Sequence, residues 1–243
     1  YANGGSLRDH LQSKQKDGFY KILWIDLIRI AKEITSGLAH LHDKNIVHRD
    51  LHSMNILINN NVALITDFGI SKHLDGITNG AASSRAILAY VEPQQCAQSE
   101  EKVDEINKKS DIYSLGVLFW ELTSGVPPFH NLHSENIAFK IASGVRENII
   151  DNTPLGYAKL IESCWSADPN QRPFLNKVLD ELNRLSTETT VEFIINRINS
   201  SNKNILANSN ISVDEVFSKN MPTSTISEFS ERRNIGKAGK KCN

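Results

Sequence analysis

HRDLHSMNIL at residues 48–57, followed by DFG at residues 67–69, is the stretch of sequence that decides the fold. It contains a carboxylate, Asp50, then an amide, Asn55, and then a second carboxylate, Asp67, just after a short apolar run. A positioned carboxylate can accept the proton of a hydroxyl group. Amide and carboxylate oxygens are hard ligands of the kind that Mg²⁺ binds. This order of residues is typical of a phosphoryl-transfer site.

In the order and spacing of these motifs the chain resembles a eukaryotic protein kinase. The resemblance covers residues 1–185: YANGGSL at residues 1–7 resembles the hinge, and the remainder resembles the larger lobe. No Gly-rich loop, strand lysine or partner Glu precedes the hinge-like segment. We therefore expect a fragment from which the smaller lobe (N-lobe) is absent. The motifs DFGISK, DIYSLGVLFWELTSG and CWSADPNQRP are most similar to those of the tyrosine-kinase-like group.

The resemblance implies ATP and Mg²⁺ as cofactors and a protein as substrate. By position, Asp50 matches the catalytic Asp that accepts the substrate proton. Asn55 and Asp67 match the metal ligands, and Asp67 would also bridge the metal to the nucleotide phosphates. Four further positions match the nucleotide pocket, namely the hinge and ribose-facing Tyr1, Ala2 and Ser6 and the adenine floor Leu57.

Two buried charges are expected to support this site. Asp111 is a carboxylate in an otherwise apolar helix, and it needs a partner because an unpaired buried charge is costly. In the family, this Asp accepts backbone N–H bonds from the loop that carries the catalytic Asp. Arg172 resembles the arginine that pairs with the Glu of an Ala-Pro-Glu motif. That motif reads Glu-Pro-Gln here, so we expect Gln94 to hydrogen-bond Arg172 without an ion pair.

The chain departs from the family pattern next to Asp50. His52 stands where Ser/Thr kinases usually carry a Lys that contacts the transferred phosphate. Ile87 stands where they carry the Thr that touches this Lys. Because both are missing together, we expect an alternative arrangement at this point. The tyrosine-kinase pattern does not match this loop either, and the group resemblance favours Ser or Thr as the phosphorylated residue.

Composition excludes several other classes of protein. The formal net charge of -1 argues against a nucleic-acid-binding protein, which usually carries a basic stripe. No apolar run approaches the roughly 18 residues that a membrane span needs. The three cysteines are scattered and suggest neither a disulfide framework nor a zinc site. We therefore expect a cytoplasmic protein with no membrane or nucleic-acid partner.

Hydrophobic periodicity predicts a mainly α fold of the α+β protein-kinase type, with a larger helical lobe and a small β hairpin. The hairpin is expected from residues 55–65, with three asparagines at its turn. Expected helices span residues 20–42, 111–122, 133–143, 155–165 and 174–185. The Ser-, Asn- and Lys-rich residues 186–243 are predicted to be disordered, except for a possible short helix at 191–198.

Two alternatives to a phosphorylating enzyme stay open. One is a kinase remnant that survives as a non-catalytic interaction module, which the missing smaller lobe, the missing Lys and the missing Glu of the Ala-Pro-Glu motif favour. The intact HRD, Asn and DFG residues argue against it. The other is a phosphotransferase for small molecules, which the long segment after DFG disfavours. As an isolated fragment the chain is expected to be nearly inactive, because the groups that grip the phosphates are missing.

Overall fold

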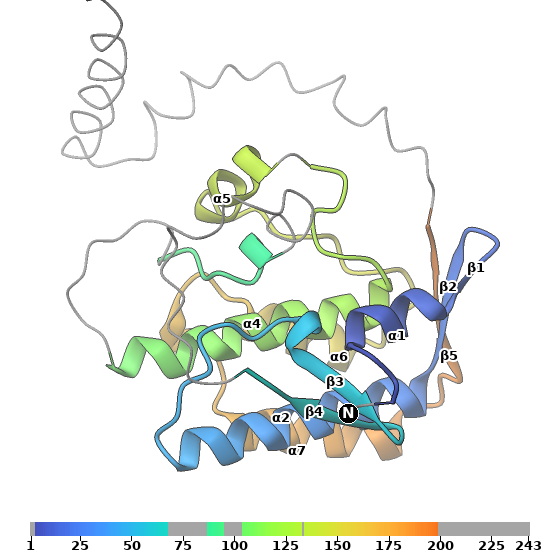
Figure 1. The fold of residues 1–243 in the computed structure, drawn as a ribbon, viewed down its shortest axis with the longest axis horizontal. Coiled ribbons are helices and arrows are strands. Elements are labelled where there is room, and N and C mark those ends of the chain that lie inside the picture. Colours follow the sequence, from blue (N-terminus) through green and yellow to red (C-terminus); the bar gives the residue numbers. More distant parts are fainter. Residues whose placement is uncertain (1–2, 68–86, 95–103, 133, 199–243) are drawn as a thin grey trace, which may run out of the picture. The chain divides into compact units, whose positions relative to one another are not determined.

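The structure is a computed structural model that describes residues 3–67, 87–94, 104–132 and 134–198 (Figure 1). Two long helices form its centre, α2 (Trp24–Asp43) and α4 (Asp104–Ser124). Helix α7 (Leu175–Glu188) packs on α2, and α6 (Leu155–Cys164) packs on α4. Two shorter helices are α1 (Leu7–Ser13) and α5 (Ser134–Ala142). The helices lie close to their predicted positions.

The two central helices differ in how they are buried, as their sequences predict. Helix α2 is amphipathic, and its apolar side, including Leu27, Ile34 and Leu38, is fully buried. From Ser110 to Ser124, every residue of α4 is buried. A helix that is apolar nearly all round belongs inside a protein. Polar side chains on α4 must therefore find partners within the core.

The predicted hairpin is confirmed as β3 (Ile56–Asn59) and β4 (Val62–Ile65), which pair antiparallel in the register Ile56↔Ile65. Its turn residues Asn60 and Asn61 have φ angles of 49° and 63°. Asparagine tolerates this left-handed conformation better than most residues, which is why the asparagine run suits a tight turn. A short 3₁₀ helix, η1 (Ser53–Asn55), leads into β3, and another, η3 (Pro169–Gln171), precedes α7.

A second sheet was not predicted. It consists of β1 (Gln15–Lys16), β2 (Phe19–Leu23) and β5 (Phe193–Arg197), in the order β1-β2-β5. The prediction that residues 20–23 begin a helix is wrong. Burial alternates along β2, as it does in a strand with one covered face. Asp17 and Gly18 both have positive φ, which gives the hairpin turn that an Asp-Gly pair favours.

The predicted disordered tail is wrong for residues 186–198, which complete α7 and form β5, a strand and not a helix. Ile194 of β5 is fully buried, and β5 pairs along the whole length of β2. Backbone bonds from Trp24 to Glu192 and from Ile198 to Gly18 fix both ends of β5. The flanking sequence is polar, but β5 itself carries Phe193, Ile194 and Ile195, and its pairing partner lies near the other end of the chain. Residues 199–243 lie outside the described part.

The fold is mainly helical with two small antiparallel sheets, which is compatible with a protein-kinase fold. In the part of the chain that the structure describes, no helix is both long and apolar enough to cross a membrane.

Ile194 and Ile195 offer a matched test of β5, because they are neighbours on opposite faces of one strand. Ile194 is fully buried, whereas Ile195 is 49% exposed. We expect Ile194→Ala to lower the free energy of unfolding by about 2–5 kcal/mol, since it leaves a cavity in the core. Ile195→Ala should change it by less than about 0.5 kcal/mol. Urea unfolding of both variants measures the difference, and equal effects would mean that β5 is not part of the folded unit.

Candidate active site

The loop that contains residues 48–55 is fixed by one buried carboxylate. Asp111 of α4 accepts hydrogen bonds from the backbone N–H of His48 at 2.8 Å and of Arg49 at 2.9 Å. His42 of α2 adds a contact of 2.8 Å between its Nε2 and the carboxylate. Asp111 is 1% exposed, so these three groups replace its hydration. The predicted role of Asp111 is confirmed, whereas the contribution of His42 was not predicted.

Held in this way, the loop places Asp50 beside Asn55. The Asn55 side-chain nitrogen donates to the Asp50 carboxylate at 3.2 Å and to the Asp50 carbonyl at 2.9 Å. The other carboxylate oxygen of Asp50 lies 3.4 Å from Nε2 of His52. The Asp50 side chain remains 15% exposed, so it is still accessible from solvent. The structure therefore brings together the predicted base and one predicted metal ligand.

Asp67 is connected to the same loop through its neighbour. The backbone N–H and the hydroxyl of Thr66 both donate to the Asn55 carbonyl, at 2.9 and 3.1 Å. Asp67 comes next and is exposed, with a φ of 58°. Both hydrogen bonds of the Asn55 amide within the described residues use its nitrogen.

This donor chemistry fits magnesium better than a metal that needs a protein cage. Magnesium is usually held by one or two carboxylates plus phosphate oxygens and waters. No cluster of three or more His, Cys, Asp or Glu side chains that could hold a metal occurs among the described residues. Asn55 and Asp67 would hold the ion.

The predicted nucleotide pocket is only partly described. Tyr1 and Ala2 lie outside the described residues. Ser6 caps α1 in a reciprocal pair with Asp9, and its backbone forms a bridge to Leu57, which is half-buried in β3. Gly4 donates to the Ile58 carbonyl at 2.9 Å, so the segment before α1 lies directly on β3. The hinge-like segment and the predicted adenine floor are therefore neighbours.

His48 has a structural role. It is fully buried, its Nε2 lies 2.9 Å from the Thr66 carbonyl, and its Nδ1 accepts the backbone N–H of Asp50 at 3.2 Å. Both ring nitrogens are thus engaged with the backbone. Phe68 of the DFG motif lies outside the described residues.

A second buried carboxylate, Glu121 of α4, connects three segments near the loop. It pairs with Nε of Arg8 at 2.6 Å, accepts the Ser53 hydroxyl at 3.1 Å and accepts the Tyr90 hydroxyl. Burial raises the pKa of Glu121, and these three partners act in the opposite direction. Sequence reasoning missed this cluster, although a Glu in an apolar helix was the same signal that identified Asp111.

The predicted contact between Gln94 and Arg172 is wrong. Arg172 forms an ion pair with Glu92, and both side chains are fully buried. Ser110 also donates to Glu92, and Arg172 donates to the Lys109 carbonyl at 2.8 Å. Glu92 occupies the place of the Ala in the usual Ala-Pro-Glu motif, so the carboxylate is supplied from two residues earlier. The ion pair is therefore kept, not lost.

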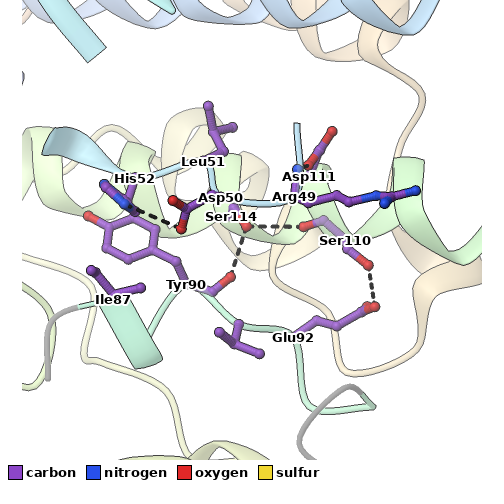
Figure 2. A pocket seen from close by; sticks show the side chains of 11 residues that line it. Arg49, Asp50, Leu51, His52, Ile87, Tyr90, Glu92, Ser110, Asp111 and Ser114 are labelled. Carbon is purple, nitrogen blue, oxygen red and sulfur yellow. Dashed lines mark hydrogen bonds and ion pairs between the residues drawn. The ribbon is translucent and has the colours of Figure 1, made fainter. Parts of the chain in front are cut away.

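Between these contacts lies a small pocket of about 30 Å³, large enough for about one water molecule (Figure 2). His52 points toward Asp50 in this view, and Tyr90 and Ile87 lie beside it. The His52 and Tyr90 rings meet edge to face, with centroids 6.1 Å apart. His52, which stands where the family usually has a Lys, thus lies against Asp50, the predicted base.

The buried ion pair between Glu92 and Arg172 predicts that substitutions of Glu92 and of Gln94 change the unfolding free energy unequally. Glu92→Ala leaves the Arg172 charge buried without its partner, which should cost about 3–5 kcal/mol of unfolding free energy. Gln94→Ala should cost less than about 0.5 kcal/mol, because Gln94 does not contribute to the pair. Chemical denaturation distinguishes them. A larger effect at Gln94 would reinstate the contact predicted from sequence.

Comparison with known proteins agrees with this geometry. The family model described as protein tyrosine and serine/threonine kinase matches residues 1–182. Similar proteins include a probable LIM domain-containing serine/threonine-protein kinase of Dictyostelium discoideum, 31% identical over 77% of this chain and 18% of its own length. The probable serine/threonine-protein kinase roco8 of the same organism is 36% identical over 78% of this chain and 10% of its own length.

Mitogen-activated protein kinase kinase kinase 10 of Xenopus laevis is 31% identical over 79% of this chain and 18% of its own length. The chain thus spans less than a fifth of each of these three relatives. Because the family model matches well over half of the chain, and its motifs lie where that family requires them, this chain belongs to the protein tyrosine and serine/threonine kinase family.

Proposed function

We propose that this chain transfers the γ-phosphoryl group of ATP to a Ser or Thr hydroxyl of a protein, with Mg²⁺ as cofactor. The observation that carries the proposal is the pair formed by Asp50 and Asn55 in a loop anchored by Asp111. A fixed carboxylate beside an amide oxygen suits a reaction that depends on positioning and on charge stabilisation.

In this proposal Asp50 receives the proton of the attacking hydroxyl. Its carboxylate is oriented by Asn55 and is partly exposed, so a substrate hydroxyl can approach it. Asn55 and Asp67 hold the metal ion, which would neutralise charge on the phosphate oxygens. Tyr1, Ala2, Ser6 and Leu57 belong to the nucleotide pocket of the same proposal. Ser6 and Leu57 are bridged to each other, which supports their assignment to one pocket.

We assign residues 1–185 to the hinge and larger lobe of the kinase domain. The sequence contains no Gly-rich loop or strand lysine before the hinge-like segment. Those parts grip the nucleotide phosphates in the family, so we expect residues 1–243 alone to bind ATP weakly and to turn over very slowly. The smaller lobe, or flanking domains of a longer protein, would supply them. The scattered cysteines favour a cytoplasmic location.

A second candidate function is a non-catalytic interaction module. The observation that favours it is the loss of the Lys and Thr pair, since His52 and Ile87 occupy those positions. A module of this kind would keep the fold without needing Asp50, Asn55 or Asp67. The two proposals therefore differ in what substitution of Asp50 does.

For the phosphorylation proposal we expect Asp50→Asn to abolish transfer from ATP to a Ser or Thr peptide. The amide preserves the shape of the side chain but cannot accept a proton, so turnover should fall by about 10²–10⁴-fold. The assay follows labelled phosphate in the full-length protein that carries this chain, or in this chain joined to a smaller lobe from a relative.

Asp151→Asn is the matched control, because Asp151 is exposed and far along the chain from the site. It should leave turnover unchanged. Nucleotide binding without turnover in the unmodified protein, on both Ser/Thr and Tyr peptide libraries, would favour the interaction module.

If Asp67 holds the metal ion, its substitution should change how activity depends on the Mg²⁺ concentration. Asp67→Asn removes one negative ligand, so the Mg²⁺ concentration at half-maximal activity should rise by about tenfold or more. A magnesium titration at saturating peptide measures it. If this concentration is unchanged while turnover falls, Asp67 does not hold the metal.

A further inference from the structure

His52 is buried, but its ring nitrogens lack hydrogen-bond partners within the described residues. The residue is 3% exposed. Its Nε2 lies 3.4 Å from the Asp50 carboxylate, which is close but longer than a well-formed hydrogen bond. Buried polar atoms without a partner are rare and usually have a functional reason.

Several other polar groups around the pocket already have partners. The Tyr90 hydroxyl donates to Glu121, and the Glu92 carboxylate pairs with Arg172. The Ser114 hydroxyl donates to the Tyr90 carbonyl at 2.8 Å. Asp111 holds the loop backbone. Asp50 is the pocket carboxylate with an oxygen 3.4 Å from Nε2 of His52.

The position of the His52 ring is set by its neighbours. It meets the Tyr90 ring edge to face, and Tyr90 is fixed in turn by Glu121 and, through that carboxylate, by Arg8 of α1. Ile87 covers the pocket with an apolar side chain where a hydroxyl would otherwise compete for the ring nitrogens. The ring is thus confined to one orientation, with Nε2 toward Asp50.

We propose that His52 is a positioning residue, whose Nε2–H donates to the Asp50 carboxylate and, together with Asn55, fixes the direction in which that carboxylate meets the substrate hydroxyl. In this arrangement His52 contacts Oδ1 of Asp50 and Asn55 contacts Oδ2. The long separation of 3.4 Å fits a contact that tightens when substrate binds. The proposal rests on the proposed function of Asp50.

His52→Leu and His52→Gln test it as a matched pair. Leucine keeps apolar bulk without a donor, whereas the glutamine amide nitrogen lies about where Nε2 of histidine does. We expect His52→Leu to lower kcat about 10- to 100-fold, with KM for ATP and peptide changed less than about threefold, because only the direction of the base is lost. His52→Gln should recover most of kcat. Equal kcat values for His52→Leu and the unmodified protein would overturn the proposal.

Turnover is measured in the full-length protein that carries this chain, with Asp50→Asn beside it. If Asp50→Asn keeps full turnover, the proposed function fails, whatever His52 does. If Asp50→Asn is inactive while His52→Leu is fully active, only the role of His52 fails. If leucine and glutamine reduce kcat equally, the effect is one of packing and the proposal is overturned.

A second measurement does not depend on turnover. Nitrogen-15 spectra of residues 1–243 should show the His52 ring with its proton on Nε2, identified by the signal missing in His52→Gln. In Asp50→Ala this Nε2 signal should shift, while the signals of His130, which is not part of the pocket lining, stay in place. A proton on Nδ1 alone, or an Nε2 signal that does not respond to Asp50→Ala, would overturn the proposal.

Discussion

The bond between Asp111 and the loop backbone is the constraint on which the rest of the site depends. One carboxylate on a buried helix accepts the N–H groups of His48 and Arg49 together with the ring of His42. Arg49 has a φ of 67°, a conformation that non-glycine residues adopt only when surrounding contacts impose it. Asp111 supplies such contacts, because its two oxygens bind the N–H groups of His48 and Arg49 at this bend. The loop carries Asp50 and Asn55, so the positions of both residues depend on α4.

Buried charges recur around this anchor, and each is satisfied from a different segment of the chain. Glu121 binds Arg8, Ser53 and Tyr90, whereas Glu92 binds Arg172 and Ser110. A buried ion pair contributes little net stability compared with an apolar pair, but the loss of one partner is costly. Such pairs therefore specify which segments must meet. The segment that contains Tyr90 and Glu92 is joined to α4 at both residues.

Several of these features could be predicted from the sequence, because their signals are local. The helices follow from their periodicity, the β3–β4 hairpin from its asparagines, and the role of Asp111 from a charge in an apolar helix. The contact of Glu92 with Arg172 was misassigned because the family motif indicated Gln94, although a carboxylate stood two residues away. Strand β5 was missed for a different reason. Its stability comes from pairing with β2, and the short apolar run at residues 193–195 does not report a partner so far away in sequence.

The unpredicted sheet bears on the site through the end of α4. The Tyr20 hydroxyl donates to the Leu122 carbonyl at 2.8 Å, and the Asn196 amide donates to the Ser124 carbonyl at 2.7 Å. Gly125 ends the helix with a φ of 72° and lies against the Tyr20 ring, where a Cβ would come within 2.1 Å of the ring. These bonds satisfy carbonyl groups that the last turn of a helix leaves unpaired. The sheet therefore fixes the end of α4 that carries Glu121. An earlier part of α4 is joined to the loop through Asp111. The strand after α7 is thus part of the framework that holds the site.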